Sequence, residues 1–246
     1  MRGATWALAA VIGLMGCSGR KSSLLLERQA RGPLAEEGRV ATAMTLHLKP
    51  ASQTQTKQSI EVELTLAAAG YLKEFFANKE IFGPYAGKSP YFPEHLVFYV
   101  KIANQTRNKI RINPAEFVMV DDRGNQYSTI GTDYVTAFAD YKHGTSTATR
   151  GVLADARPGY FGFSLPVGQM VASKPQGQFA LLQQSALQSG YLYPGVVHDG
   201  LIAFWNPAAA TQRLLVIVAN IKTAFDANDL PTTAVDFTFE FDTTKP

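Results

Sequence analysis

The 246-residue sequence has one cysteine, Cys17, and few charged residues. Because no second thiol exists to form a disulfide within the chain, a folded domain must be stabilised by core packing. Charged side chains make up 17% of the residues, and the formal net charge is only +3. The lysines and arginines are scattered along the whole sequence. Nucleic-acid binding, which needs a concentrated basic face, is therefore not expected.

The common catalytic signatures are missing as well. The sequence has no Gly-x-Ser-x-Gly motif and no phosphate-binding glycine pattern. Its carboxylates form no pair with the spacing typical of acid and base catalysis. Ser18 and Lys21 match a Ser-x-x-Lys motif, but the polar segment around them would neither desolvate nor position them. We therefore expect a protein that is not an enzyme and binds no cofactor.

The apolar stretch at the N-terminus is too short to cross a bilayer. Met1 and Arg2 precede it, and it runs from Ala4 to Met15 with only Thr5 as a polar interruption. A helix needs about 20 residues to cross a hydrocarbon layer of about 30 Å. A targeting segment that is removed from the mature chain explains the stretch better.

Leu14, Met15, Gly16 and Cys17 end this stretch and resemble the lipobox of bacterial lipoproteins, which have type II signal peptides. The resemblance implies that residues 1–16 are a signal peptide and that Cys17 becomes the first residue of the mature chain. The Cys17 thiol would carry a diacylglyceryl group and its amine a further acyl chain. Two or three acyl chains anchor a protein stably.

The expected location is the cell envelope, with the membrane bound through the N-terminal lipid. Ser18 resembles the residue found at this position in lipoproteins that reach the outer membrane of a cell with two membranes. Residues 17–39 mix Ser, Gly, Pro and charged residues without an apolar period, which is typical of a tether. Residues 40–246 would then form the folded domain.

Within this domain, apolar and polar residues alternate with a period of two, which predicts half-buried strands. Eight or nine strands are expected, including Ile60–Leu66, Leu96–Ile102, Ile110–Ile112, Phe117–Val120, Tyr160–Leu165, Leu201–Trp205, Leu214–Ile221 and Val235–Phe241. The polar breaks at Asn104–Asn108 and Asp122–Asn125 predict hairpin connections. Helical spacing occurs at Ala67–Phe76, Asp133–Tyr141 and Phe179–Ser189. Many short strands with polar links favour a sandwich or barrel over a parallel α/β sheet.

The segments Tyr99–Tyr127 and Tyr193–Phe204 resemble the immunoglobulin-like sandwiches of bacterial lipoproteins and secreted antigens. Shared features are the Asn-rich turn, the Pro-containing corner, the Asp-Gly hairpin and a Pro-Gly, spacer, Gly, apolar strand. The expected fold is therefore mainly β, an immunoglobulin-like antiparallel β-sandwich with short helical insertions. Such motifs specify a fold rather than an activity.

Two aromatic segments are candidate recognition sites. Tyr85, Tyr91 and Phe92 belong to a proline-rich loop, and Tyr191 and Tyr193 belong to a shorter segment of similar composition. Tyrosine and phenylalanine offer a large contact area with few rotatable bonds, as a protein or glycan partner requires. Alternatively, the rings cap an open end of the sandwich, because soluble domains limit their exposed apolar patches. Trp205, on a predicted strand, is expected in the core.

Metal binding is not expected. His143 near Asp140 and His198 beside Asp199 are the best candidates, but adjacent residues of a strand point to opposite faces. The main functional hypothesis is a non-enzymatic envelope lipoprotein that contacts another envelope component, either a protein or a glycan. A periplasmic carrier of a small ligand or metal, using the His143 and His198 loops, is the alternative. An envelope hydrolase with dispersed active-site residues is less favoured.

Overall fold

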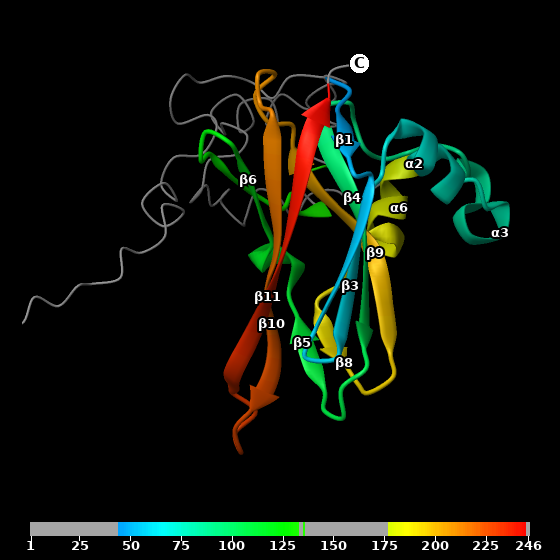
Figure 1. Ribbon diagram of the computed structural model, residues 1–246. Helices are drawn as coiled ribbons and strands as arrows, with labels where there is room; N and C mark the ends of the chain where they lie inside the picture. The colour runs from blue at the N-terminus through cyan, green and yellow to red at the C-terminus, as the bar shows by residue number, and fades with distance from the viewer. Residues whose placement is uncertain (1–43, 133–134, 136–176, 245–246) are drawn as a thin grey trace, which may run out of the picture.

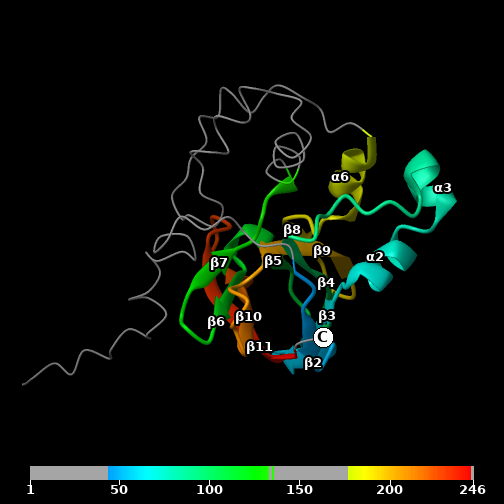
Figure 2. The ribbon, with the colours of Figure 1, turned by 90° about the horizontal axis from the view of Figure 1, so that it is seen from above.

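The computed structural model describes residues 44–132, 135 and 177–244. In these ranges the chain forms two antiparallel sheets that face each other, with short helices beside them (Figures 1 and 2). This confirms the expected fold class, a mainly β, sandwich-like domain with short helical insertions. None of the helices in the described part of the chain is long and apolar enough to cross a membrane.

The four-stranded sheet, sheet B, has the strand order β2-β3-β4-β9. Its strands are β2 (Ser52–Lys57), β3 (Ile60–Leu66), β4 (His95–Asn104) and β9 (Val197–Trp205). On β3 the apolar residues Ile60, Val62 and Leu64 are fully buried, while the polar residues between them are partly exposed. The alternation seen in the sequence therefore identified both the strand and its inner face.

The seven-stranded sheet, sheet A, is built around one long hairpin. Strand β10 (Arg213–Phe225) pairs with β11 (Pro231–Thr244), and β1 (His47–Lys49) extends the β11 edge. The other edge of β10 is divided between β6 (Val118–Asp121) and β5 (Ile110–Ile112). On their far sides, β6 pairs with β7 (Gln126–Ser128) and β5 pairs with β8 (Gly190–Leu192).

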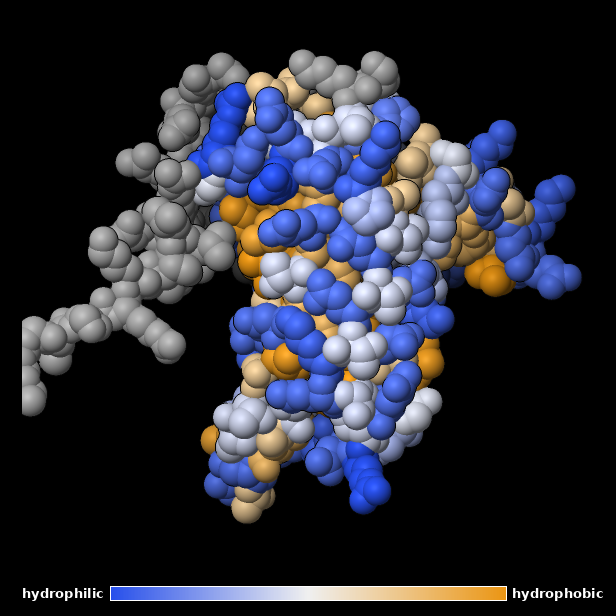
Figure 3. All heavy atoms as spheres, in the orientation of Figure 1, coloured by the Kyte–Doolittle hydropathy of each residue, from blue (hydrophilic) through white to orange (hydrophobic). Residues whose placement is uncertain are grey.

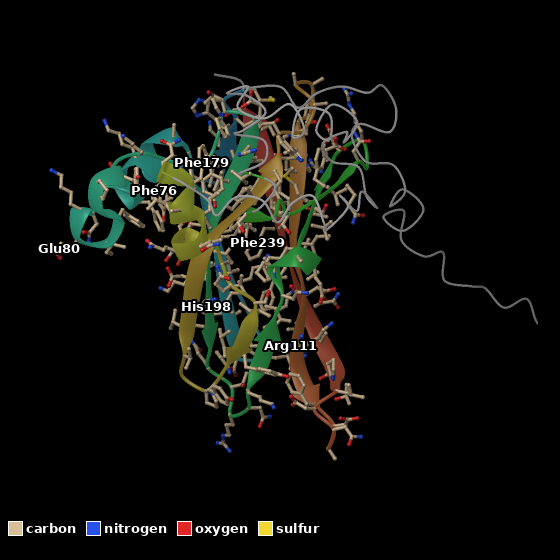
Figure 4. All side chains as sticks on the ribbon, turned by 180° about the vertical axis from the view of Figure 1, so that it is seen from behind. Phe76, Glu80, Arg111, Phe179, His198 and Phe239 are labelled. Atoms are coloured by element: carbon tan, nitrogen blue, oxygen red, sulfur yellow. The ribbon has the colours of Figure 1, made fainter. Side chains whose placement is uncertain are left out.

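The main core lies between the sheets and contains many aromatic rings. Phe98 and Phe241, from opposite sheets, have ring centroids 5.5 Å apart, and Trp205 is buried as expected. Figure 4 shows Phe239 in this interior. The other fully buried members with large side chains include Phe117, Tyr127, Phe204, Phe237, Ile60, Leu64, Ile102 and Ile110.

Side chains of β2 connect the two sheets along an open edge. Gln53, Gln55 and Lys57, which alternate on β2, donate hydrogen bonds to the backbone carbonyls of Glu240, Thr238 and Asp236 on β11. These carbonyls belong to the stretch of β11 that precedes the residues paired with β1, Asp242–Thr244. The polar β2 side chains thus satisfy edge carbonyls that would otherwise be available to a further strand.

The helices gather at one end, on the outer face of sheet B (Figures 1 and 2). They are α2 (Ala69–Phe75), α3 (Lys79–Phe82), η1 (Gly83–Tyr85), η3 (Gly177–Ala180) and α6 (Leu181–Ser185). Phe76, Phe82 and Leu181 form a second core there with Val97, Leu201 and Ala203 of sheet B. We call this region the helical end. The helix expected in Ala67–Phe76 is confirmed.

The segment Phe179–Ser189 is helical only as far as Ser185. Beyond it, Ala186 forms a bridge with Leu201, and the Leu187 amide donates to the Leu201 carbonyl at 3.0 Å. The chain passes so close to β9 that a Cβ on Gly200 would lie 2.5 Å from the Leu187 nitrogen. Pairing with β9 therefore ends the helix earlier than its sequence spacing suggested.

The expected connection at Asp122–Asn125 is confirmed, but the one at Asn104–Asn108 is wrong. The first joins the paired strands β6 and β7, with Gly124 at φ 76°. The second leads from β4 in sheet B to β5 in sheet A, and these two strands do not pair. Its polar residues form a turn between sheets, which local composition does not distinguish from a hairpin. The strand expected at Tyr160–Leu165 and nearly all of the helix expected at Asp133–Tyr141 lie outside the described residues.

Candidate functional site

Three turns meet at the end of the molecule opposite the helical end (Figure 1). They are the β4–β5 turn (residues 105–109), the β8–β9 turn (193–196) and the β10–β11 turn (226–230). We call these turns, together with Tyr191, Val197 and Phe225 at the strand ends beside them, the tip. Figure 4 places Arg111, on the adjoining strand β5, toward this lower end and Phe76 and Phe179 at the helical end.

Asn104 fixes two of these turns to each other. Its backbone amide donates to the Val196 carbonyl at 3.0 Å, and its own carbonyl accepts from the Gly195 amide at 2.7 Å. The buried Asn104 side chain also donates to the carbonyls of Asn108 and Leu192 and accepts from Thr106. A buried amide with this many partners is held rigidly, so the β4–β5 and β8–β9 turns form one unit.

The β10–β11 turn is ordered by a carboxylate. One oxygen of Asp226 accepts from the backbone amides of Asn228 and Leu230, each at 2.8 Å. Asp229 has a positive φ of 63°, a conformation that Asp tolerates better than most residues. Leu230 follows directly, and its side chain is 60% exposed. The turn therefore presents an apolar side chain to solvent from an ordered backbone.

A cluster of charged and aromatic side chains links this hairpin to β5 and β8. Lys109 forms an ion pair with Asp229, and its Nζ lies 4.8 Å and 5.1 Å from the ring centroids of Tyr191 and Phe225. The Tyr191 hydroxyl donates to the other Asp229 oxygen at 2.7 Å, and Arg111 lies 5.7 Å from the Tyr191 ring. Lysine and arginine over aromatic faces are favourable cation–π arrangements.

These contacts also affect the protonation of the cluster. The hydrogen bonds from Lys109 and then from Tyr191 lower the pKa of Asp229 below its ordinary 3.8. The hydrogen bond with Asp229 raises the pKa of Lys109 and that of Tyr191. The cluster consequently keeps its charges, with a carboxylate and an ammonium group, over the whole neutral range.

The tip carries most of the large apolar side chains that are exposed in the described residues. Tyr191, Tyr193, Val196, Val197 and Leu230 are between 38% and 61% exposed, and Ile81 on α3 is the sixth such residue. The space-filling view shows hydrophobic surface at the lower end of the β10–β11 hairpin and on α3 (Figure 3). A concentration of this kind at one end marks a contact surface more often than scattered exposure does.

The other predicted aromatic segment packs against the body of the protein. Tyr85 and Tyr91 are half-buried against the second core, and Phe92 packs on the main core. The Phe92 ring also stacks on Phe179, with centroids 5.9 Å apart. Burial raises the pKa of Tyr91 well above its ordinary 10.0, although a hydrogen bond with Ser185 lowers it in part. The five predicted aromatic residues thus lie in two separate regions, and only Tyr191 and Tyr193 are exposed.

A cavity of about 530 Å³ lies beside α6 at the helical end of sheet B. Leu182, Leu187, Ile130 and Ile202 contribute apolar walls, and Gln183 and Thr129 contribute polar groups. The volume is within the range of small-molecule sites, and so is the mixture of apolar walls with a few polar groups. No local pattern in the sequence marks this cavity, because its lining comes from segments that are far apart in the chain.

The histidines and aspartates weighed as metal ligands in the sequence do not come together in the described ranges. No three His, Cys, Asp or Glu side chains come together there as a metal ion would require. His198 instead places its Nε2 3.1 Å from the Gln188 carbonyl, and Asp199 accepts from the Tyr99 hydroxyl at 2.9 Å. Asp140 and His143 lie outside the described residues, as do Leu14, Met15, Gly16 and Cys17.

Sequence reasoning missed Leu230, Val196 and Lys109 as members of the site. Leu230 directly follows the polar residues Asp226–Asp229, and an apolar residue beside such a turn-forming run was a usable but unused signal. The partnership of Lys109 with Asp229, 120 positions apart, had no local signal.

Comparison with solved structures finds two similar chains. No protein-family model matches the sequence, and no curated protein matches it. The YjhA protein of Bacillus subtilis has 8% sequence identity and a TM-score of 0.33, with 76% of this chain and 93% of that chain covered. A functionally unknown protein of Listeria monocytogenes has 10% identity and the same TM-score, with 92% and 94% covered.

Proposed function

We propose that this protein is a lipid-anchored, non-enzymatic binding module of the bacterial cell envelope and that it contacts another envelope component through its tip. The observation that carries the proposal is the exposure of Tyr191, Tyr193, Val196, Val197 and Leu230 at one end of the domain. Binding a partner that covers such side chains removes apolar surface from water, which makes the free energy of binding more favourable.

The position of the tip relative to the N-terminal side of the domain supports the proposal. Met44, the first residue of the continuous described chain, donates to the Pro93 carbonyl near the helical end. Strand β1 follows at that same end (Figure 1). The segment that would carry the lipid thus joins the described domain at the end opposite the tip, which leaves the tip available for a second contact. With Ser18 after the lipid, the outer membrane is the proposed location in a cell with two membranes.

Photo-crosslinking in intact cells tests the binding surface. A photoreactive amino acid replaces Tyr193 in one strain and Ile81 in a control strain, since both side chains are 61% exposed. We expect specific crosslinked products at position 193 and none, or different ones, at position 81. Identical products from the two positions would contradict a contact through the tip.

Lipid labelling tests the anchor independently. Cells grown with a labelled fatty acid should label the native protein and not the Cys17→Ser variant, because only the thiol accepts the diacylglyceryl group. The variant should also be lost from the membrane fraction. Unlabelled native protein would refute the anchor without affecting the crosslinking result.

A second candidate function, a periplasmic carrier of a small ligand, is favoured by the 530 Å³ cavity alone. Native mass spectrometry of protein purified from its own cells tests it. Ala115 lines the cavity at an exposed position, so Ala115→Trp should obstruct the cavity without disturbing the core. A bound mass that the variant loses would support the carrier, and the absence of any bound mass would contradict it.

A further inference from the structure

We infer that the partner of the tip is an anionic lipid surface, with the apolar side chains of the turns entering the headgroup region. The inference rests on the proposed function only in taking the tip as the contact surface. It concerns a second contact with lipid, made by folded side chains and separate from the acyl chains on Cys17.

The shape of the tip favours a soft partner over a rigid one. Tyr193, Val196 and Leu230 stand on turns that protrude from strand ends, and the cavity lies at the helical end. A protein partner would need a matching depression for each protruding side chain, since stable interfaces require close complementarity. A bilayer interface admits protruding groups without such matching.

The side-chain types also suit a bilayer interface. Tyr191 and Tyr193 have an apolar ring and a polar hydroxyl, a combination that is stable where hydrocarbon meets water. Leu230 and Val196 are purely apolar and are largely exposed. Moving them from water into the acyl boundary is favourable in proportion to the area that they bury.

The charge of the tip and of the strand beside it indicates anionic lipid. Arg107 and Arg111 are exposed, and Lys109 lies between them in sequence. The acidic residues of the tip are Asp226 and Asp229. Asp226 accepts from two backbone amides of its own turn, and Asp229 is paired with Lys109 and Tyr191. The two arginines are thus the charges most available to phosphate headgroups, and basic residues near an anionic surface favour binding to it.

The length of the anchor permits contact with either of two bilayers. The chain from Cys17 to Met44 spans 27 residue steps and reaches at most about 90 Å. Strand β11, with 14 residues, spans about 45 Å of the body. The tether therefore allows the tip to return to the anchoring membrane or to face another one, and the proposed ligand, an anionic lipid headgroup, is the same in both cases.

A fluorescent label on the tip tests the inference. The full chain carries Cys17→Ser, so that Leu230→Cys provides its only thiol, and Ile81→Cys is the matched control because Leu230 and Ile81 are 60% and 61% exposed. The labelled proteins are mixed with phosphatidylcholine vesicles with or without phosphatidylglycerol. We expect a blue shift, and quenching by nitroxide-labelled lipid, for position 230 with the anionic vesicles only.

Several outcomes would overturn the inference. They are no spectral change at position 230, an equal change at both positions, or an equal response to neutral and anionic vesicles. Co-sedimentation of unlabelled full-length Cys17→Ser protein gives a second measure. There Arg107→Gln should weaken binding to the anionic vesicles about fivefold, and Tyr193→Ser with Leu230→Ser about tenfold or more. Unchanged sedimentation of these variants would also overturn it.

Failure of this inference is distinguishable from failure of the proposed function. If the vesicle experiments fail while position 193 crosslinks to an envelope protein or to a second copy of the chain, the tip is a contact surface but lipid is the wrong partner. If position 193 gives no specific product and the vesicles are not bound either, both proposals fail.

Discussion

Two segments with similar composition end in opposite environments. Pro84–Pro93 and Tyr191–Pro194 are both rich in tyrosine and proline, yet the first packs on the body of the protein and the second stays in solvent. The difference comes from their neighbours. The first lies among helices that bring Phe76 and Phe82 to the outer face of sheet B, whereas the second joins two strand ends. Composition alone therefore does not distinguish a packing loop from a recognition loop.

The largest expected effect tests the helical end. Phe76 is fully buried between Phe75 and Phe82, with ring centroids 5.1 Å from each. Phe76→Ala should lower the free energy of unfolding by about 3–5 kcal/mol, because it removes buried area and leaves a cavity. Tyr193→Ala, at the tip, should change it by no more than about 0.5 kcal/mol. Urea unfolding measures both, and equal losses would contradict the contrast between the two ends.

A smaller loss of stability is expected where the chain that follows α6 passes close to β9. Gly200→Ala places a Cβ within 2.8 Å of three backbone atoms of Ala186 and Leu187, so the chain must move away from β9. Overpacking of this kind costs about 1–3 kcal/mol. Gly190→Ala on β8 is the matched control, because a Cβ there meets no atom within 4 Å. Thermal unfolding that does not separate the two variants would show that the close approach is unimportant.

The sequence predicted the elements in which one face is buried. Ile60–Leu66 and Val235–Phe241 alternate because each strand has an inner and an outer side. Strand β2 escaped prediction because Ser52–Lys57 is entirely polar, and the hydrogen bonds from Gln53 and Gln55 to β11 join residues more than 180 positions apart. The local sequence around β2 therefore does not indicate that partner. The turn at Asn104 was recognised from its polar residues, but the sequence did not indicate that this turn leads from sheet B to sheet A.

The candidate site was predictable only in the part that depends on residue type. Tyr191 and Tyr193 were identified from their residue type, which is a local property. Whether a ring is exposed depends on which distant segment reaches it. Phe92 meets Phe179, and Tyr191 meets Asp229. In each case the environment is set by tertiary contacts that composition and spacing do not encode.

An intermediate effect is expected at high pH. Burial, and then the nearby charge of Asp121, raises the pKa of Tyr127, whose hydroxyl donates to Asp121 at 3.1 Å. A raised pKa in the folded state favours the protonated hydroxyl. Its contribution to stability is therefore complete below pH 10.0, the ordinary value, and is lost as the pH rises toward the folded value. Tyr127→Phe should cost about 1 kcal/mol at neutral pH and flatten this alkaline decline, as measured by unfolding at a series of pH values.

The smallest effect on stability is expected in the charged cluster beside the tip. Asp229 has a lowered pKa because Lys109 and Tyr191 bind its carboxylate, so the contribution of these bonds is present above pH 3.8 and is lost as the pH falls through the folded value. Asp229→Asn should lower Tm at neutral pH less than Phe76→Ala, Gly200→Ala or Tyr127→Phe, and added salt should reduce the difference, because the groups are exposed to solvent. NMR titration of the Asp229 carboxyl carbon should give a midpoint below 3.8. A midpoint at or above that value would mean that Lys109 and Tyr191 do not bind the carboxylate. The β10–β11 turn, which carries Leu230, would then not be held against β5 and β8, and the tip would not be the ordered surface described above.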